Sequence, residues 1–466
     1  MSSTLRTPPA GPRRPDLDSL SCIDADGSRV KIHTADVRGR YQVRKKILWT
    51  ILIALYLALP WLTVDGRPAV LIDIAQRQFY LFGATFNAQD FWLAFFPLSG
   101  IGFALIVLSA LYGRVWCGYA CPQTVFLEGV FRRVERLFEG SAQQQKRAAA
   151  RGMTSGLALR RAGKYVTWAA ISFVLAHTLL GYFMPAREVL AAISGSPSAH
   201  PTAFWFVTVL GLIIYFNFAW FREQLCIVIC PYGRLQGVLY DRDTVNVGYD
   251  KKRGEPRGHH AVAGRGDCID CFRCVAVCPT GIDIRNGTQL ECVGCANCID
   301  ACDEVMDKVG QPRGLVRYDS ERGFEEGRRR LLRPRLWFYA VLLLIGVGVF
   351  ALAASGRMPF EAKLSRQQGA SYTVDGATLT NALSLHFVNK SAGPMTFTIT
   401  PLESEQLAWT VPLREVTLPS FGDQRVPLFA RLPRAAFVRG RHAEVGVTVG
   451  GMATTLTIEL LGPEAR

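Results

Sequence analysis

Eight cysteines between positions 268 and 302 form two runs with the same spacing. The first run is Cys268-x-x-Cys271-x-x-Cys274-x-x-x-Cys278, and the second is Cys292-x-x-Cys295-x-x-Cys298-x-x-x-Cys302. Thiolates this close together allow a short, turn-rich backbone to surround one inorganic centre from three sides. A distant fourth cysteine then joins the two halves. The spacing therefore constrains this part of the chain to a fold that wraps around metal.

The same spacing occurs in two-cluster bacterial ferredoxins, where three cysteines of each run bind one [4Fe–4S] cluster and the fourth binds the other. The alternatives, two zinc sites or a disulfide framework, require the repeated spacing to be accidental. All thirteen cysteines lie at or before Cys302, and no disulfide framework is indicated, which fits a reducing compartment. Asp303 stands where proline often follows the fourth cysteine, which removes a rigid turn but no ligand. The pattern predicts a protein that transfers electrons.

The chain is too apolar for a typical soluble protein, with 49% hydrophobic residues and a mean hydropathy of +0.16. Five apolar stretches account for this, and each is long enough to cross about 30 Å of hydrocarbon. The predicted spans are Ile47–Val64, Phe91–Leu111, Tyr165–Met184, Phe204–Phe221 and Leu336–Ala354. A buried core helix is the alternative for any one of them, but five in one chain favour a membrane protein.

Basic residues are distributed unevenly between the predicted loops. They are frequent before the first span and after the second, at Arg44, Lys45, Lys46, Arg114, Arg132, Arg133, Arg136, Lys146, Arg147, Arg151, Arg160, Arg161 and Lys164. The positive-inside rule then places the N-terminus and the ferredoxin segment in the cytoplasm and the C-terminal tail outside the bacterial inner membrane. Anionic lipid headgroups explain the net charge of +15, and nucleic acid is not needed. No cleaved signal peptide is expected, because no apolar run follows Arg13-Arg14 until Ile47.

A second set of cysteines lies in the membrane region, in a repeated C-x-x-x-C-P motif. The motifs are Cys117-x-x-x-Cys121-Pro122 and Cys226-x-x-x-Cys230-Pro231. Both follow an outside-to-inside span, so two parallel repeats would bring the four thiols towards a common centre at the cytoplasmic face. Cysteines four apart share one helical face, and proline ends the helix before it.

Such thiolates suit Cu(I), a further iron–sulfur centre or reversible dithiol chemistry, and buried inert cysteines are the alternative. The spacing leaves open whether they form one site or two. The stretch Val125–Phe138 after the first motif is amphipathic and is expected to lie in the membrane interface.

Other candidate residues carry weaker signals. Cys22 has no nearby partner and is expected to be a free thiol. His177 lies inside the third predicted span, where haem or quinone contact competes with a structural role. His259-His260 lies in a linker, Asp241–Asp267, that is expected to be solvated. The chain contains no nucleotide-binding fingerprint, so the electron donor is expected to be another molecule.

The composition changes after Ala354. Thr378–Asn389, Thr396–Thr400 and Glu444–Val449 alternate apolar with polar residues, which is the period of half-buried strands. About 100 residues of short strands favour an immunoglobulin-like sandwich without a disulfide. This tail is interpreted as a docking module, with a stabilising cap as the alternative.

The predicted fold is an α-helical membrane bundle of five transmembrane helices with an inserted dicluster ferredoxin domain and a C-terminal immunoglobulin-like β-sandwich. The expected parts are a cytoplasmic N-terminal segment (1–46), a four-helix membrane domain (47–240), a linker and ferredoxin domain (241–330), a fifth transmembrane helix (336–354) and a periplasmic β domain (360–466).

From about Arg29 onward this arrangement resembles the FixG/RdxA/CcoG family of cytochrome c oxidase accessory proteins. The resemblance rests on the paired C-x-x-x-C-P motifs, the linker Tyr249–Gly258, the eight-cysteine segment and the β-rich tail. It implies a cupric reductase that supplies Cu(I) for the copper centre of cbb3-type oxidase. The implied partners are membrane lipid and either oxidase subunits or copper-handling assembly factors.

The resemblance also implies roles for particular residues. Copper or redox-relay positions would be Cys117, Cys121, Cys226 and Cys230. One cluster would be held by Cys268, Cys271, Cys274 and Cys302, and the other by Cys278, Cys292, Cys295 and Cys298. Electrons would enter from a cytoplasmic reductant or from quinol.

Two other functions remain open from the sequence. A quinol dehydrogenase of the NapH type also combines four spans, C-x-x-x-C-P motifs and two clusters, and it would pass electrons to a periplasmic partner. A non-catalytic assembly scaffold would use the clusters as a redox or oxygen sensor.

Overall fold

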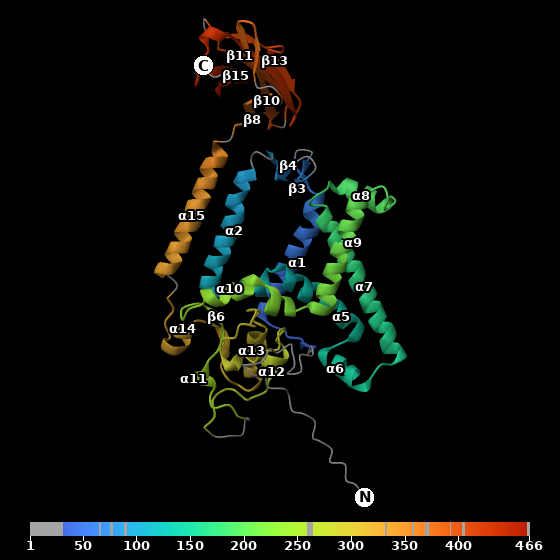
Figure 1. Ribbon diagram of the computed structural model, residues 1–466. Helices are drawn as coiled ribbons and strands as arrows, with labels where there is room; N and C mark the ends of the chain where they lie inside the picture. Colours follow the sequence, from blue (N-terminus) through green and yellow to red (C-terminus); the bar gives the residue numbers. More distant parts are fainter. Residues whose placement is uncertain are drawn as a thin grey trace. The chain divides into compact units, whose positions relative to one another are not determined.

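A computed structural model describes residues 31–463 apart from 65–66, 75–77, 88–90, 259–263, 331–332, 357, 368, 370–371, 392 and 403–405 (Figure 1). Arg13-Arg14, Cys22 and His259-His260 lie outside these residues. The chain forms two compact units: one holds most of the helices and the cysteine-rich segment up to Val349, and the other holds the β-rich tail from Phe350 together with Gln78–Phe79, Ala84–Asn87 and Phe91–Leu93.

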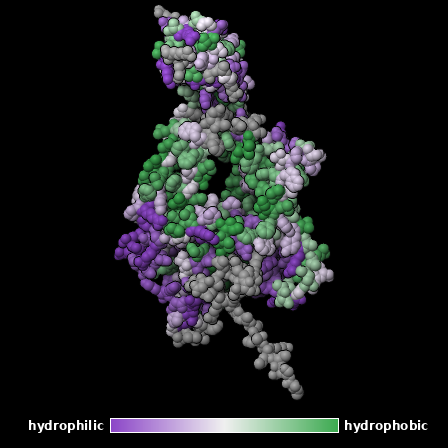
Figure 2. Space-filling view, viewed as in Figure 1, coloured by the Kyte–Doolittle hydropathy of each residue, from purple (hydrophilic) through white to green (hydrophobic). Residues whose placement is uncertain are grey.

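Helices occur at all five predicted spans. These are α1 (Arg40–Ala58), α2 (Phe91–Tyr112), α7 (Ser155–Leu180), α9 (Pro201–Phe216) with the π-helix η4 (Asn217–Phe221), and α15 (Pro334–Ser355). Three are long and apolar enough to cross a membrane, namely Trp92–Tyr112, Pro201–Phe221 and Pro334–Ser355. In Figure 2 the surface over α2, α9 and α15 is mainly hydrophobic.

The first predicted span extends past the end of its helix. α1 ends at Ala58, and Pro60 lies in the short 3₁₀ turn η1 (Leu59–Trp61) that follows. Proline lacks the N–H that would continue the helix. Short strands follow that the sequence did not predict: β1 (Thr63–Val64), β2 (Arg67–Pro68), β3 (Val70–Asp73), β4 (Gln78–Leu81) and β5 (Ala84–Asn87).

Shorter helices connect the long ones. They are α3 (Val115–Tyr119), α4 (Pro122–Phe126), the π-helix η3 (Leu127–Phe131), α5 (Arg132–Glu139), α6 (Ala142–Arg151), α8 (Ala186–Ser194), the π-helix η5 (Leu225–Ile229) and α10 (Pro231–Leu239). Three π-helices lie close in sequence to the two C-x-x-x-C-P motifs, and π-helical turns are frequent at functional sites.

The cysteine-rich segment has little regular structure. It contains β6 (Asn246–Tyr249), α11 (Lys251–Gly254), α12 (Arg273–Ala276), the 3₁₀ turn η6 (Ile284–Asn286), α13 (Asn297–Lys308), β7 (Val316–Asp319) and α14 (Glu321–Glu326). β6 and β7 pair antiparallel, with Val247 opposite Tyr318. Its small core includes Ile299, Met306 and Leu315.

The tail forms two antiparallel sheets. One has the order β12-β14-β10-β8 with β9 also paired to β10, and the other has the order β13-β11-β15-β16. The strands are β8 (Phe360–Arg366), β9 (Tyr372–Asp375), β10 (Thr378–Asn389), β11 (Met395–Pro401), β12 (Ala408–Thr410), β13 (Glu415–Leu418), β14 (Asp423–Pro433), β15 (His442–Val449) and β16 (Met452–Glu459). Alternate side chains of both sheets, such as Phe387 and Phe397, form the core. The predicted two-sheet sandwich is confirmed.

Candidate functional site

The two cysteine runs have matching backbone conformations. Asp270 and Phe272, which flank the second cysteine of the first run, have φ of 55° and 53°. Gly294 and Ala296 flank the second cysteine of the second run, with φ of 64° and 60°. Left-handed backbone at a residue other than glycine costs on the order of 1–3 kcal/mol and occurs where the surroundings require it. The repetition therefore indicates a shared constraint on how each run presents its thiols.

The eight cysteines gather around two cavities. What we call the inner cavity is lined by Cys278, Cys292, Cys295 and Cys298, and what we call the outer cavity by Cys268, Cys271, Cys274 and Cys302. Cys274 also lines the inner cavity. Each set combines three cysteines of one run with the fourth of the other, which is the arrangement that the spacing predicts.

The walls of both cavities are otherwise mainly apolar, with Val247 and Ile282 in the inner one and Leu315 and Val316 in the outer one. Among the described residues, no group of three or more His, Cys, Asp or Glu side chains is placed to hold one metal ion. A cubic cluster binds each thiolate to a different iron, so its ligands stand further apart than those of a zinc ion. Four cysteines around each cavity, three from one run and one from the other, are the ligand set of a [4Fe–4S] cluster.

Proline interrupts the helix in each C-x-x-x-C-P motif. Pro122 and Pro231 are the first residues of α4 and α10, and the cysteine before each has extended backbone. This interruption was predicted, since proline disfavours helical backbone in the residue before it. The expectation that each cysteine pair shares one α-helical face is wrong, because α3 ends at Tyr119 and Cys226 lies in the π-helix η5.

The four membrane-region cysteines, which we call the quartet, form one group: Cys117, Cys121, Cys226 and Cys230. Burial raises the pKa of the Cys117 and Cys226 thiols to about 12, and the other thiols of the quartet add to the increase. Burial and the nearby Cys230 also raise the pKa of Cys121. The thiols of the two motifs therefore lie near one another, although among the described residues they are not placed to hold one metal ion.

Arg114 lies between the quartet and the inner cavity. Its side chain is 5% exposed and donates a hydrogen bond to the carbonyl oxygen of Gly233. Its positive charge opposes the increase in pKa at Cys117 and Cys226, and it does the same at Cys292 of the inner cavity. One buried cation therefore acts on both groups of thiols.

Two glycines bring the first motif into direct contact with the second cysteine run. A Cβ on Gly118 would lie 2.8 Å from Cα of Cys295, and a Cβ on Gly294 would lie 3.0 Å from the carbonyl carbon and oxygen of Arg114. The Tyr318 hydroxyl fixes the loop by donating to the Gly294 carbonyl at 2.6 Å. The residue beside Cys117 thus packs on the backbone of an inner-cavity cysteine.

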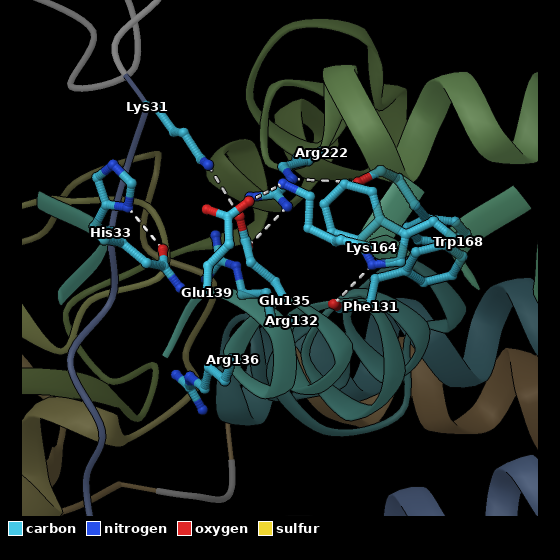
Figure 3. A network of polar contacts seen from close by, with 12 residues as sticks. Lys31, His33, Phe131, Arg132, Glu135, Arg136, Glu139, Lys164, Trp168 and Arg222 are labelled. Carbon is cyan, nitrogen blue, oxygen red and sulfur yellow. Dashed lines mark hydrogen bonds and ion pairs between the residues drawn. The ribbon is translucent and has the colours of Figure 1, made fainter. Parts of the chain in front are cut away.

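A buried network of ion pairs holds the two repeats together (Figure 3). Arg222, which precedes the second motif, pairs with Glu135 of α5 at 2.9 Å, and Lys31 pairs with the same carboxylate at 2.9 Å. Burial would raise the pKa of Glu135, but these two cations outweigh it and hold the pKa at about 2. Lys164 of α7 pairs with Glu139 at 2.5 Å.

Arg132 connects this network to the cysteine-rich segment. It is 3% exposed, pairs with Glu223 at 3.2 Å and with Glu128 at 2.5 Å, and donates to the carbonyl oxygen of Pro279 at 3.4 Å. Arg132 falls in the predicted amphipathic stretch, Val125–Phe138, and the sequence did not predict that its side chain is buried. Its partners come from distant segments, although the i,i+4 spacing from Glu128 was a visible signal.

His177 is distant from the quartet in the sequence, and its contacts described below are with other residues. Its Nδ1 is 2.7 Å from the carbonyl oxygen of Phe173, and it lines a mainly apolar cavity of about 290 Å³ with His200. The structural role expected for this histidine is compatible with that hydrogen bond.

These features define a class. Two cysteine-lined cavities that fit [4Fe–4S] clusters, together with three helices apolar enough to cross a membrane, describe a membrane-associated iron–sulfur electron-transfer protein. Family models agree: residues 221–321 match a 4Fe-4S dicluster domain, residues 93–140 a 4Fe-4S binding domain, and residues 350–460 the "IG-like fold at C-terminal of FixG".

The chain belongs to the FixG/RdxA family. It is 41% identical over 340 residues to Protein RdxA of Cereibacter sphaeroides, covering 70% of this chain and 72% of that protein. It is 34% identical over 434 residues to Protein RdxB of the same organism, covering 87% and 89%. Ferredoxin-type protein NapH of Haemophilus influenzae is more distant, at 24% identity over 225 residues, which cover 45% of this chain and 68% of NapH.

Proposed function

We propose that this chain is a five-span protein of the bacterial inner membrane that reduces Cu(II) to Cu(I) at the quartet. The N-terminus and the ferredoxin domain face the cytoplasm, and the β-sandwich faces the periplasm. The Cu(I) product serves assembly of the copper centre of cbb3-type oxidase, with oxidase subunits or copper-handling assembly factors as partners.

The contact between Gly118 and Cys295 carries this proposal. It supports a short route from the inner cavity to the quartet through two packed backbones. In this assignment one cluster is bound by Cys278, Cys292, Cys295 and Cys298, and the other by Cys268, Cys271, Cys274 and Cys302.

The chemistry requires one electron for each copper ion, and a cytoplasmic reductant or quinol would supply it. When bound, a [4Fe–4S] cluster supplies electrons singly. The quartet binds copper as thiolates, which favour the soft Cu(I) product, and binding releases protons because the pKa values of Cys117 and Cys226 are raised. Arg114 partly neutralises the resulting negative charge in a buried site.

Anaerobic Cu(II) reduction by the purified protein tests the proposal, with a Cu(I)-specific chromogenic chelator as the readout. The Cys226→Ser/Cys230→Ser variant should lose copper reduction while keeping both clusters, and added Cu(I) should restore oxidase maturation. Cys22→Ser serves as the control, since Cys22 belongs to neither motif. Full oxidase maturation by the double variant without added Cu(I) would show a non-catalytic scaffold.

A quinol dehydrogenase is the second candidate. The similarity to NapH and the apolar cavity beside His177 and His200 favour it. Cavities of this size and lining accept the head of an amphipathic ring compound. Oxidation of menaquinol or ubiquinol without copper reduction, lost in His177→Phe, would favour this function over the first.

A further inference from the structure

A second large cavity, which we call the basic pocket, adjoins the inner cavity. Its volume is about 500 Å³. Five segments line it: the stretch Thr34–Arg38, the first turns of α1, the region from α4 to α5, Pro279, and the cluster loop with Cys295 and Asn297. Volumes in this range accept small ligands or lipid headgroups.

The charged side chains of the basic pocket are mostly positive. The basic ones are Arg38, Lys45, Lys46, Arg133 and Arg136, and the acidic ones are Asp36 and Glu128. Both acids have cationic partners, since Asp36 pairs with Arg136 at 2.7 Å and Glu128 pairs with Arg132 at 2.5 Å. The acids therefore leave a surplus of positive charge.

Three cations carry this surplus. Within the part of the chain that the structure describes, Arg38, Lys46 and Arg133 line the pocket and make no ion pair. Their side chains are exposed, so each can turn towards a ligand at low cost. Several cations converging on one concave site favour a multiply acidic ligand such as a phosphate group, to which arginine donates paired hydrogen bonds.

The pocket is also coupled to the inner cavity. Lys45 is 1% exposed and donates to the carbonyl oxygen of Cys295 at 2.7 Å and to the side chain of Asn297. Cys295 lines both the pocket and the inner cavity. A ligand in the basic pocket thus lies beside a thiolate that is placed to bind the inner cluster.

We propose that the basic pocket binds a phosphate group and that the bound anion lowers the reduction potential of the inner cluster. A negative charge beside a cluster disfavours adding an electron to it. The phosphate group comes either from an anionic phospholipid or from a soluble phosphate ester. The apolar part of α1 begins at Ile47, next to Lys46, so a lipid headgroup can reach the site. The binding is independent of copper, and only the effect on the cluster rests on the proposed electron-transfer function.

The test uses the full chain with both clusters in nanodiscs and needs no copper. One arm compares phosphatidylglycerol with phosphatidylcholine, and the other adds inorganic phosphate to phosphatidylcholine discs. The readout is an EPR-monitored redox titration that separates the inner from the outer cluster. Phosphatidylglycerol, inorganic phosphate or both should lower the potential of the inner cluster and leave the outer one unchanged, and the effective probe identifies the source.

Arg133→Ala should weaken, by about fivefold, the binding of whichever probe shifts the potential of the inner cluster. This is the effect expected for one basic residue beside an anionic headgroup. Arg147→Ala is the matched control, because Arg147 is equally basic and exposed but lies on α6 outside the pocket. If neither probe shifts the inner cluster, or if both variants respond alike, the proposal is wrong and the cations only balance the charge of the cluster. A protein that reduces no copper but shows the shift would overturn the proposed function and leave this inference standing.

Discussion

The outer and inner cavities have the same number of cysteines and matching backbones but very different surroundings. Of the cysteines that the structure describes, Cys271 of the outer cavity alone is exposed. Cys295, at the equivalent position of the inner cavity, packs against Gly118 and accepts a hydrogen bond from Lys45 at its carbonyl oxygen. A duplicated sequence has thus produced one cavity that faces solvent and one that faces the quartet.

Under the proposed function, this difference would give the electron path a direction. A soluble donor can approach the outer cavity at Cys271, and Cys274 lines both cavities and connects them. Under the proposed function, the inner cavity would then deliver electrons through the contact between Cys295 and Gly118. We therefore expect changes in the two cavities to have unequal effects, in the following order of size.

The largest effect is expected from removing the second cysteine of either run. Cys271→Ser and Cys295→Ser should each lose about half of the iron and acid-labile sulfide, because each removes a ligand of one cluster. When the protein is reduced with dithionite and the excess is removed before Cu(II) is added, Cys271→Ser should still reduce copper through the inner cluster, whereas Cys295→Ser should not. Metal analysis, EPR and the chelator assay measure these outcomes, and equal loss of copper reduction in both would contradict the proposed order.

Gly118→Ala should slow electron transfer to the quartet several-fold while both clusters remain bound. The new Cβ would lie 2.8 Å from Cα of Cys295, so the two backbones must separate. Rapid mixing of pre-reduced protein with Cu(II) measures the rate. Gly156→Ala is the matched control, since a Cβ there meets open space. An unchanged rate in Gly118→Ala would show that electrons do not pass through this contact.

Arg114→Gln should lower the reduction potential of the inner cluster and leave that of the outer cluster unchanged. The loss of a nearby buried positive charge disfavours the reduced state by on the order of 1–2 kcal/mol. An EPR redox titration reports both clusters in one sample, so the outer cluster is an internal control. Arg114→Lys should keep most of the wild-type potential, and a shift of both clusters by the same amount would argue against this local effect.

The smallest effect is expected for Asp270→Gly, which gives the first run the glycine that the second run has. The ion pair with Arg285 at 2.5 Å is lost, but the strain of positive φ is relieved, so stability should change by less than about 1 kcal/mol. The equivalent position, Gly294, packs on the backbone of Arg114, and Gly294→Ala should be clearly more destabilising. Anaerobic thermal unfolding compares the two variants, and equal destabilisation would show that the surroundings do not differ as described.

Local patterns in the sequence predicted the elements that depend on local chemistry. Period-two alternation predicted a strand at Thr378–Asn389, and these are the bounds of β10. Cysteine spacing predicted the two sets of four cysteines that line the cavities. The prolines after Cys121 and Cys230 indicated where helices are interrupted. Such signals lie within a few residues of one another, so no knowledge of the tertiary fold is needed.

Features that depend on tertiary packing escaped prediction. Arg132 and Arg222 look like ordinary cytoplasmic charges in the sequence, and only the fold brings their carboxylate partners to them. Gly118 and Gly294 each look like a loop residue, although a side chain on either would collide with the backbone of the other segment. The end of α1 was missed for a different reason, because Pro60 is a local signal in the sequence but the predicted span Ile47–Val64 continued through it.

The pairing of Glu135 with Arg222 has a consequence for biosynthesis. A nascent chain that has completed α5 already contains Lys31 but lacks Arg222, which comes 87 positions after Glu135, so burying the carboxylate with one cation is less favourable than in the finished chain. Complete closure of this network therefore waits until Arg222 has been synthesised. A truncated product that ends before Arg222 would leave the charged face of α5 at Glu135 exposed to proteases and chaperones.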